Sequence, residues 1–465
     1  MPARVVVLGG GYAGVACVRR LQSRAGRDLQ VTLVDRNPFH TLLTETHTVA
    51  AGTRPVSTVA LPFDFGPQVR RLEAEVTAIH PEGRWVETTA GSLEYDYLVF
   101  ALGGADQDYG IPGVREHALF LRGIDDARRI RAALAALPRQ APVVIVGGGL
   151  TGVELAAEIA LSRPGGSLTV VEGAPTLLPS LHPGLALRAR RRLGWLGVNV
   201  RTGSPVRAVG PDRVELADGT VLPHRLLIWV AGVKGHPLTA QLKVRRDRAG
   251  RVEVDAYLRS SRPEIYVIGD SAAFRPAPDA RPLAPSGQLS EQMGFAAADD
   301  LLSRLEGGPG VPFRPHFRGV LLDLGGLAAA GLIYRLQVAG PVAHLAKRAA
   351  VAGHVARTLG LRSLFRLLTG RGLPVGSTPG PQPAAPAGPR VHGETGSREN
   401  TRVEEAAPDT AGGKARWTAQ GTDASQTAPN TAAMAGGPAA GAELPGEAGF
   451  PGSPADPGSA GFPPP

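Results

Sequence analysis

The chain has 465 residues, of which 43% are hydrophobic and 20% charged, with a formal net charge of +9. This length is more than one small module needs and predicts about two or three domains with apolar cores. Cys17 is the single cysteine, so an intramolecular disulfide and a cysteine-based metal cluster within one chain are both excluded.

The N-terminal residues lead directly into the apolar run 5–8. No basic-then-apolar leader or cleavage site precedes that run, so we expect no signal peptide. Residues 324–334 form a later apolar stretch, but it is glycine-rich and falls short of the roughly 20 residues that a membrane-spanning helix needs. We therefore expect no transmembrane helix.

A glycine motif follows the first apolar run. Gly9, Gly11 and Gly14 have the spacing G-x-G-x-x-G, and a helical pattern comes directly after them. In such a motif the first glycine makes a tight turn, the second lets the backbone approach a pyrophosphate, and the third lets helix and strand pack closely. A second strand pattern, residues 29–35, ends in Asp35, where an acid would bind a ribose.

The same pattern occurs again in the middle of the chain. The apolar run 143–146 precedes Gly147, Gly149 and Gly152, and a following strand pattern ends in Glu172. The two acids lie 26 and 25 residues after the first glycine of their motifs. A single such motif is weak, but two complete units at matching spacing predict two dinucleotide sites whose helix N-termini bind phosphate.

The repeat continues beyond these units, because residues 94–103 are echoed by 225–232. Alternating segments before each copy predict antiparallel excursions from a parallel sheet, and residues 264–270 predict a further strand. The expected fold is α/β with two Rossmann-like domains. The first domain (1–115 and 255–320) is interrupted by the second (116–254).

The composition changes near Pro374. Residues 375–465 contain 15 Pro, 16 Gly and 19 Ala, so we expect 374–465 to be a disordered tail. The tail has five basic and nine acidic residues, which leaves 45 basic against 32 acidic residues, or net +13, for the rest. Such a charge would suit nucleic acid, anionic lipid or an anionic cofactor.

These motifs, together with Ile268-Gly269-Asp270, resemble the flavoprotein oxidoreductases with two dinucleotide-binding domains. Within that group the chain resembles the type II, non-proton-pumping NADH:quinone oxidoreductases of the respiratory chain. The resemblance implies that the first unit binds FAD and the second NADH. The implied FAD residues are Gly9, Gly11, Gly14, Asp35, Ala101, Gly103, Gly269 and Asp270, and the implied NADH residues are Gly147, Gly149, Gly152, Glu172 and Gly232. Leu102 departs from the family, which usually has Thr there.

The number of cysteines separates the candidate electron acceptors. Disulfide reductases and sulfide:quinone oxidoreductases need paired cysteines, which this chain lacks. Cys17 is expected to be a buried small apolar residue. Glu172 favours NADH over NADPH, because a carboxylate would repel a 2′-phosphate.

Three residues are candidate catalytic groups. Glu154 lies one turn past the second glycine motif, where the family has a residue for nicotinamide contact or proton handling; the alternative is an acid that only favours the helix dipole. Gln288 and Gln292 resemble the family's quinone motif and lie on one helix face, although glutamines on a helix are often merely solvated. For His40 and His47 we favour hydrogen-bonded structural roles over catalytic ones. No metal site is expected.

Residues 321–373 resemble the family's C-terminal membrane-associating region. One apolar stripe comprises Leu361, Leu364, Phe365 and Leu368, and another comprises Val351, Val355 and Leu359. No acidic residue lies between Leu324 and Gly393, while basic residues are frequent. The expectation is a peripheral protein on anionic lipid at the cytoplasmic face of the membrane, reducing menaquinone or ubiquinone. Packing against a domain or in a homodimer is the alternative.

Two other functions are left open. One is a flavoprotein reductase of a small electron-transfer protein, such as a ferredoxin or rubredoxin, which would use the basic surface for an acidic partner. The other is a non-enzymatic flavin-binding signalling protein that uses its charge on nucleic acid. The sequence has no helix-turn-helix pattern, so nucleic acid is not an expected partner.

Overall fold

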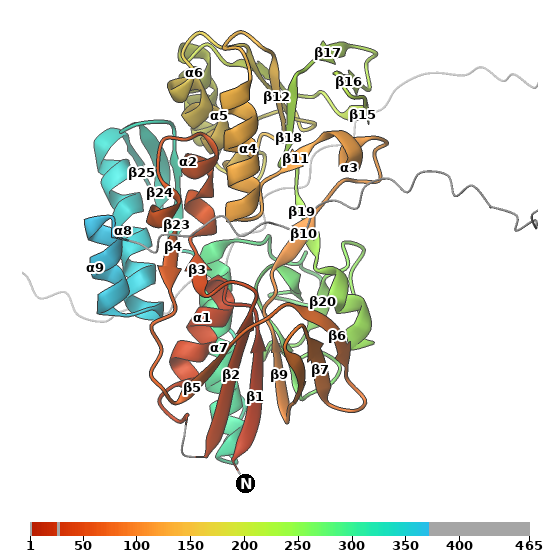
Figure 1. Cartoon of the computed structure of the whole chain (residues 1–465), viewed down its shortest axis with the longest axis vertical. Coiled ribbons are helices and arrows are strands. Elements are labelled where there is room, and N and C mark those ends of the chain that lie inside the picture. The colour runs from red at the N-terminus through yellow and green to blue at the C-terminus, as the bar shows by residue number, and fades with distance from the viewer. Residues whose placement is uncertain (1, 26–27, 372–465) are drawn as a thin grey trace, which may run out of the picture. The chain divides into compact units, whose positions relative to one another are not determined.

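The computed structural model describes residues 2–25 and 28–371. Its first part is built on a five-stranded parallel sheet in the order β21-β9-β1-β2-β5 (Figure 1). The strands are β1 (Ala3–Leu8), β2 (Leu29–Asp35), β5 (Val69–Glu73), β9 (Tyr97–Phe100) and β21 (Ile265–Val267). Helices α1 (Tyr12–Leu21) and α7 (Gly287–Leu305) cross closely, because a Cβ at Gly294 would lie 2.2 Å from the carbonyl oxygen of Ala13.

A second parallel sheet repeats this arrangement in the order β11-β18-β12-β13-β14. Its strands are β11 (Leu119–Phe120), β12 (Val143–Val146), β13 (Leu168–Val171), β14 (Asn199–Arg201) and β18 (Leu226–Trp229), and its helices are α4 (Ile124–Ala136), α5 (Leu150–Ser162) and α6 (Pro183–Trp195). In both sheets the central strand pairs with the strand that ends in the acid and, on its other side, with the returning strand of the repeat. The predicted pair of Rossmann-like sheets is confirmed.

The two excursions are also antiparallel, as expected from the alternating segments. One comprises β6 (Val76–His80), β7 (Trp85–Thr88) and β8 (Gly91–Glu94), and the other comprises β15 (Val206–Val209), β16 (Arg213–Leu216) and β17 (Val221–Pro223). Each excursion leaves its parallel sheet, and the next strand, β9 in the first half and β18 in the second, returns to it. In each half the repeat thus comprises the strand with its glycine turn and helix, the strand that leads to the acid, the antiparallel excursion and the returning strand.

The chain crosses between the two halves on two paired strands, β10 (Gly104–Asp106) and β19 (Val233–Gly235). After β19, the turn η3 (Pro237–Leu242) lies against β6, where the Gln241 side chain accepts the Ile79 N–H. Strand β20 (Val252–Val254) then pairs with β22 (Ala272–Phe274) beyond the turn η4 (Gly269–Ser271). The domain limits at 115 and 255 stay a prediction.

The C-terminal region contains a sheet that the sequence did not reveal. Strands β23 (Gly319–Asp323), β24 (Ala329–Ile333) and β25 (Leu336–Ala339) are antiparallel, and helices α8 (Gly340–Thr358) and α9 (Leu361–Thr369) follow them. We expected helices in this region, and α8 and α9 are present, but the three strands that precede them were not predicted. Strands of only four or five residues give little periodicity to read.

The remaining elements connect β2 to the rest of the first half and link the halves. They are β3 (Phe39–Thr41), η1 (Leu43–Glu45), α2 (Thr46–Ala50), η2 (Val56–Thr58), β4 (Ala60–Pro62) and α3 (Val114–His117). Among residues 2–25 and 28–371, no helix is both long and apolar enough to cross a bilayer. The predicted tail, 374–465, lies outside the described residues.

Candidate functional site: two glycine turns and a buried charge cluster

The first glycine turn has the geometry that a bound pyrophosphate requires. Gly9 has φ +97°, and a Cβ at Gly14 would lie 1.8 Å from the Gly9 carbonyl oxygen, so both positions exclude other residues. Gly11 is the N-cap of α1, and a Cβ there would meet no atom within 4 Å. The backbone around Gly11 is thus open to an anionic group, as FAD binding needs.

The second turn repeats this geometry almost atom for atom. Gly147 has φ +115°, and a Cβ at Gly152 would lie 1.8 Å from the Gly147 carbonyl oxygen. Gly149 is the N-cap of α5 and is open on its Cβ side. The residues present therefore fit a second dinucleotide.

The two acids at the strand ends hold the glycine turns. Asp35 Oδ2 accepts the Gly10 N–H at 2.6 Å, and Glu172 Oε2 accepts the Gly148 N–H at 2.6 Å. The other carboxylate oxygens accept the N–H of Asn37 and of Ala174. Each oxygen has two lone pairs, so these bonds leave acceptor capacity for a ribose hydroxyl.

The remaining predicted cofactor residues surround the first turn and the crossing strands. A Cβ at Gly9 would lie 2.5 Å from the Ala101 carbonyl oxygen, which shows how closely β9 approaches the turn. Gly103 has φ +74° and its carbonyl accepts the Ser271 hydroxyl at 2.5 Å. Burial raises the pKa of Asp270, although Arg122 lies 3.9 Å away and opposes that shift.

Gly232 and Gly269, the two other predicted glycines, both have positive φ, +146° and +74°. A Cβ at Gly232 would lie 2.8 Å from the hydroxyl oxygen of Tyr109, and one at Gly269 would lie 3.3 Å from the Ala13 Cβ on α1. Both positions therefore bring the backbone close to a neighbouring element.

The two predicted quinone glutamines bind backbone in the structure. Gln288 accepts the Arg318 N–H at 2.8 Å and donates to the Gly319 carbonyl, while Gln292 accepts the His316 N–H and donates to the His316 carbonyl, both at 2.9 Å. These bonds fasten α7 to the segment before β23. Contact with a quinone stays a prediction for both residues.

Glu154 lies in a buried cluster of charges. Its carboxylate accepts the Lys347 ammonium at 2.5 Å and the Asp323 N–H at 3.0 Å, and the same ammonium lies 2.8 Å from Asp323 Oδ2 and 3.8 Å from Glu45 Oε1. The cluster thus joins helices α5 and α8 to strand β23 and turn η1. Since no acid occupies the first turn of α5, a simple helix-dipole role does not account for Glu154.

Electrostatics keeps the cation of this cluster, Lys347, charged. Burial alone would lower the pKa of Lys347, but the surrounding carboxylates raise it above its ordinary value. Burial likewise raises the pKa of Glu154, with Lys347 opposing, whereas at Asp323 the ammonium outweighs burial and the pKa is lowered. Lys347 is therefore charged throughout the physiological range.

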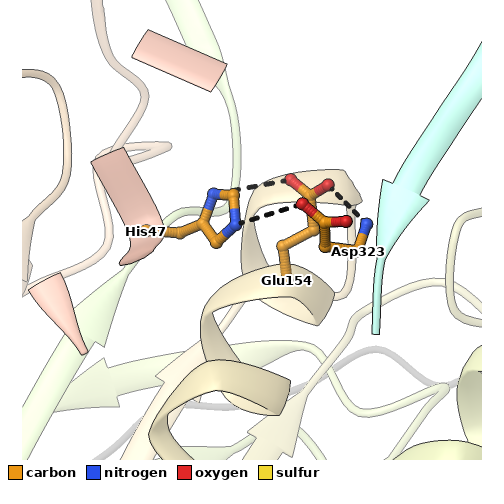
Figure 2. Close-up of side chains that lie close together, drawn as sticks. All are labelled: His47, Glu154 and Asp323. Carbon is orange, nitrogen blue, oxygen red and sulfur yellow. Dashed lines mark hydrogen bonds and ion pairs between the residues drawn. The ribbon is translucent and has the colours of Figure 1, made fainter. Parts of the chain in front are cut away.

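His47 completes this cluster as a neutral ring (Figure 2). Its Nδ1 lies 3.8 Å from Glu154 and its Nε2 4.0 Å from Asp323, while burial, with help from Lys347, lowers its pKa to about 4. The three side chains have the composition of a metal site. Between the two carboxylates, however, the Lys347 ammonium takes the place that a metal cation would occupy.

Several residues of this site escaped the sequence analysis. The basic residues of α8 were expected to face lipid, but Lys347, Arg348 and Arg357 pair with acids from distant segments. Lysine is scarce in this arginine-rich chain, with four Lys among 50 basic residues, so its presence at 347 was an available signal. The stripe of Val351, Val355 and Leu359 also packs into the core.

Cys17 is fully buried on α1, as predicted, and burial raises the pKa of its thiol to about 12. No second cysteine exists in the chain to form a redox pair with it. Dithiol chemistry is therefore excluded.

Comparison with known proteins gives a family that agrees with the two dinucleotide sites predicted from the glycine turns. Residues 3–288 match the family Pyridine nucleotide-disulphide oxidoreductase, so the chain belongs to that class of flavoprotein fold. A type II NADH:quinone oxidoreductase of Staphylococcus saprophyticus is 30% identical over 381 residues, which cover 74% of this chain and 93% of the relative. Its Staphylococcus aureus counterpart is 29% identical over the same shares of both chains. Within the class, the chain belongs to the type II NADH:quinone oxidoreductases.

Solved structures show the same fold at lower sequence identity. NDH2 from Plasmodium falciparum in complex with NADH is similar with a TM-score of 0.70 and 19% identity, covering 80% of this chain and 97% of that chain. The sulfide:quinone oxidoreductase from Aquifex aeolicus has a TM-score of 0.66 and 20% identity, over 79% and 92% of the two chains.

Proposed function

We propose that the protein oxidises NADH and reduces a membrane quinone, with FAD as its bound cofactor and without pumping protons. The observation that carries this proposal is the pair of matched glycine turns on two parallel sheets of one chain. The names of its relatives support the quinone as acceptor. The single buried cysteine supports an acceptor other than a disulfide or sulfide.

The predicted cofactor residues form two sets, one around each glycine turn. For FAD we assign Gly9, Gly11, Gly14, Asp35, Ala101, Gly103, Gly269 and Asp270, and for NADH we assign Gly147, Gly149, Gly152, Glu172 and Gly232. In the first set the helix N-terminus at Gly11 attracts the pyrophosphate, and Asp35 keeps the turn in shape. Bound FAD supplies the hydride acceptance and the two-electron transfer that amino acid side chains cannot perform.

The charge cluster is proposed to handle protons during quinone reduction. Lys347 keeps its proton at Nζ, within 2.5 Å of Glu154 and 2.8 Å of Asp323, and Glu154, whose pKa burial raises, is the group that takes up and releases a proton in this proposal. Four buried polar atoms here have no hydrogen-bond partner among the described residues: Glu45 Oε1, His47 Nε2, Asp323 Oδ1 and His344 Nδ1. Such atoms suit contact with a polar ligand or water.

Helix α9 is the proposed contact with the membrane. Leu361, Phe365 and Leu368 are 77%, 60% and 70% exposed on one face, and the exposed Arg362 and Arg366 lie beside them. An apolar face flanked by basic residues suits the surface of anionic lipid, where each basic residue contributes on the order of 1 kcal/mol. This geometry supports a peripheral attachment to a membrane, and we propose that the cytoplasmic face is the side contacted.

An anaerobic titration tests the proposed reaction. The protein is purified in mild detergent, its flavin is reduced with one equivalent of NADH, and a menaquinone or ubiquinone analogue is then added while flavin absorbance is followed. We expect bleaching by NADH and rapid recovery with quinone. Gln288→Leu and Gln292→Leu should slow the recovery, whereas Gln337→Leu on the exposed edge strand β25 should not.

A different pattern would identify a different acceptor. Bleaching without recovery by quinone would contradict the proposal and point to a protein acceptor such as a ferredoxin. That reaction should then run without lipid and fall steeply with added salt. Protein that contains no flavin would contradict the proposal at its first step.

A further inference from the structure

The peptide between Gly10 and Gly11 is held from one side by a histidine. His40 Nδ1 lies 2.9 Å from the Gly10 carbonyl oxygen, which can only accept, so this nitrogen donates. In a planar trans peptide the C=O and N–H bonds point in opposite directions. By fixing the Gly10 oxygen, His40 therefore also fixes the direction of the Gly11 N–H at the N-terminus of α1.

His40 is itself held by the C-terminal helix. Since its Nδ1 donates and burial lowers its pKa to about 3, with His354 adding to that effect, the ring is neutral and its Nε2 accepts. His354 Nε2 lies 3.2 Å from that atom and must be the donor. Both rings are buried, at 0% and 4% exposure.

The other side of His354 meets a carboxylate. His354 Nδ1 lies 2.7 Å from Glu291 Oε2, and Arg357 donates to Glu291 Oε1 at 2.7 Å. Burial would raise the pKa of Glu291, but these two donors lower it to about 2, so Glu291 is ionised and accepts. His354 thus donates from both nitrogens, to Glu291 and to His40. Its ring also stacks on Tyr12, with centroids 4.3 Å apart.

The second glycine turn provides an internal comparison. The equivalent carbonyl, that of Gly148, accepts a backbone N–H from Leu178 at 2.9 Å. The NADH turn is therefore fixed by a loop of its own domain. The FAD turn depends instead on a side chain that is 30 residues away and on a helix 314 residues further along the chain.

We propose that His354 is a positioning residue for FAD: acting through His40, it aims the Gly11 amide at the pyrophosphate, so that α8 controls how tightly FAD, but not NADH, is held. This inference rests on the proposed function, since it takes the first turn as the FAD site. Neither histidine is expected to touch the reacting atoms.

The test measures the rate of FAD release from the full-length holoprotein after dilution. His354→Phe keeps the ring that stacks on Tyr12 and removes both donors, and His40→Phe removes the donor to Gly10. Each should speed FAD release about tenfold, the effect of about one buried hydrogen bond. Because both act on the same amide, the double variant should release FAD no more than about twofold faster than His40→Phe alone.

Two controls separate positioning from a general loosening of α8. Val355→Ala removes buried volume on the same helix without touching the hydrogen bonds, so it should lower the melting temperature and leave FAD release unchanged. NADH affinity, measured on each holoprotein variant, should be unaltered. His354→Gln, which keeps one donor, replaces His354→Phe if the latter does not fold, with an intermediate release rate expected.

Three outcomes would overturn the inference. These are unchanged FAD release in both histidine variants, equal acceleration by Val355→Ala, or two single effects that multiply to about a hundredfold in the double variant. Each leaves the proposed function intact, because wild-type flavin reduction and reoxidation are measured separately. Absence of FAD from the wild-type protein would instead contradict the proposed function.

Discussion

Lys347 places one ammonium among the carboxylates of Glu154, Asp323 and Glu45, all of them buried. A group of buried carboxylates is stable only when a cation or a bound proton compensates its charge. The charge of this lysine therefore compensates the surrounding carboxylates.

Replacing Lys347 with Ala should destabilise the fold by about 3–5 kcal/mol, because it leaves buried carboxylates unpaired. Protonation would then relieve the repulsion, so the folded variant would bind more protons than the unfolded chain and gain stability as the pH falls. Denaturant unfolding at about pH 8 and about pH 5 should show a smaller deficit at the lower pH.

The exposed pair of Arg207 and Glu215 supplies the comparison for this experiment. Arg207→Ala should cost at most about 1 kcal/mol, since the Arg207 side chain is 68% exposed. A deficit for Lys347→Ala that is equally small, or that grows as the pH falls, would show that the ammonium does not hold the cluster together.

Glu172 has two expected effects, on the NADH turn and on cofactor choice. Glu172→Ser removes the acceptor for two backbone amides, so NADH should bind about tenfold more weakly. It also removes the charge that repels a 2′-phosphate, so the ratio of kcat/KM for NADH to that for NADPH should fall. Glu215→Ser on strand β16, outside both glycine turns, should change neither value, and an unaltered ratio in Glu172→Ser would place Glu172 outside the cofactor site.

At the residue scale, the sequence predicts the turn glycines and their acids because a local spacing defines them. It does not predict the partners of Glu154, since Asp323 and Lys347 lie 169 and 193 residues away. The absence of acids between 324 and 393 suggested a basic surface, yet acids from other segments neutralise part of it. Long-range ion pairs leave no periodic pattern in a sequence.

Among the elements, α8 and α9 divide the C-terminal region between two surroundings. Helix α8 turns its charged residues inward to Glu154, Asp323, Glu45 and Glu291. Helix α9 turns Leu361, Phe365 and Leu368 outward, and its Leu364 and Leu367 pack inward. Three residues of the predicted stripe, Leu361, Phe365 and Leu368, therefore lie on the outward face, whereas Leu364 is partly buried and packs against the core.

Changing Phe365 and Leu368 to Glu should abolish sedimentation with anionic vesicles, because it puts two charges into the proposed lipid-facing surface. NADH oxidation with a water-soluble electron acceptor should stay within about twofold of wild type, since both side chains are exposed. Val221→Glu, at an apolar position on β17 that is 53% exposed, is the control and should bind vesicles normally. Full vesicle binding by the double variant would move the membrane contact elsewhere.

For the whole molecule, the internal repeat made the fold predictable. One pattern of strand, glycine turn, helix and acid, read twice, correctly indicated both sheets and both antiparallel excursions. The sheet β23-β24-β25 could not be predicted in the same way, because it occurs once and its strands are short. Its role in bringing Asp323 to Glu154 became clear only in three dimensions.

Removing the chain after Gly376 should leave FAD content, NADH affinity and quinone reduction unchanged. The reason is compositional, since the segment from 375 onward has too few large apolar residues to build a core. Flavin absorbance and quinone-dependent NADH oxidation of the shortened protein provide the measurement. Loss of either would give this segment a functional role.

The dependence of the first glycine turn on α8 has a consequence for how the protein is made. The FAD turn is among the first residues to be synthesised, but the helix that holds it comes near the end of the described chain. Domains generally fold as units from the N-terminus during translation. A nascent chain can therefore complete both parallel sheets and still retain flavin poorly until α8 emerges, so flavin loading becomes a late step of biosynthesis.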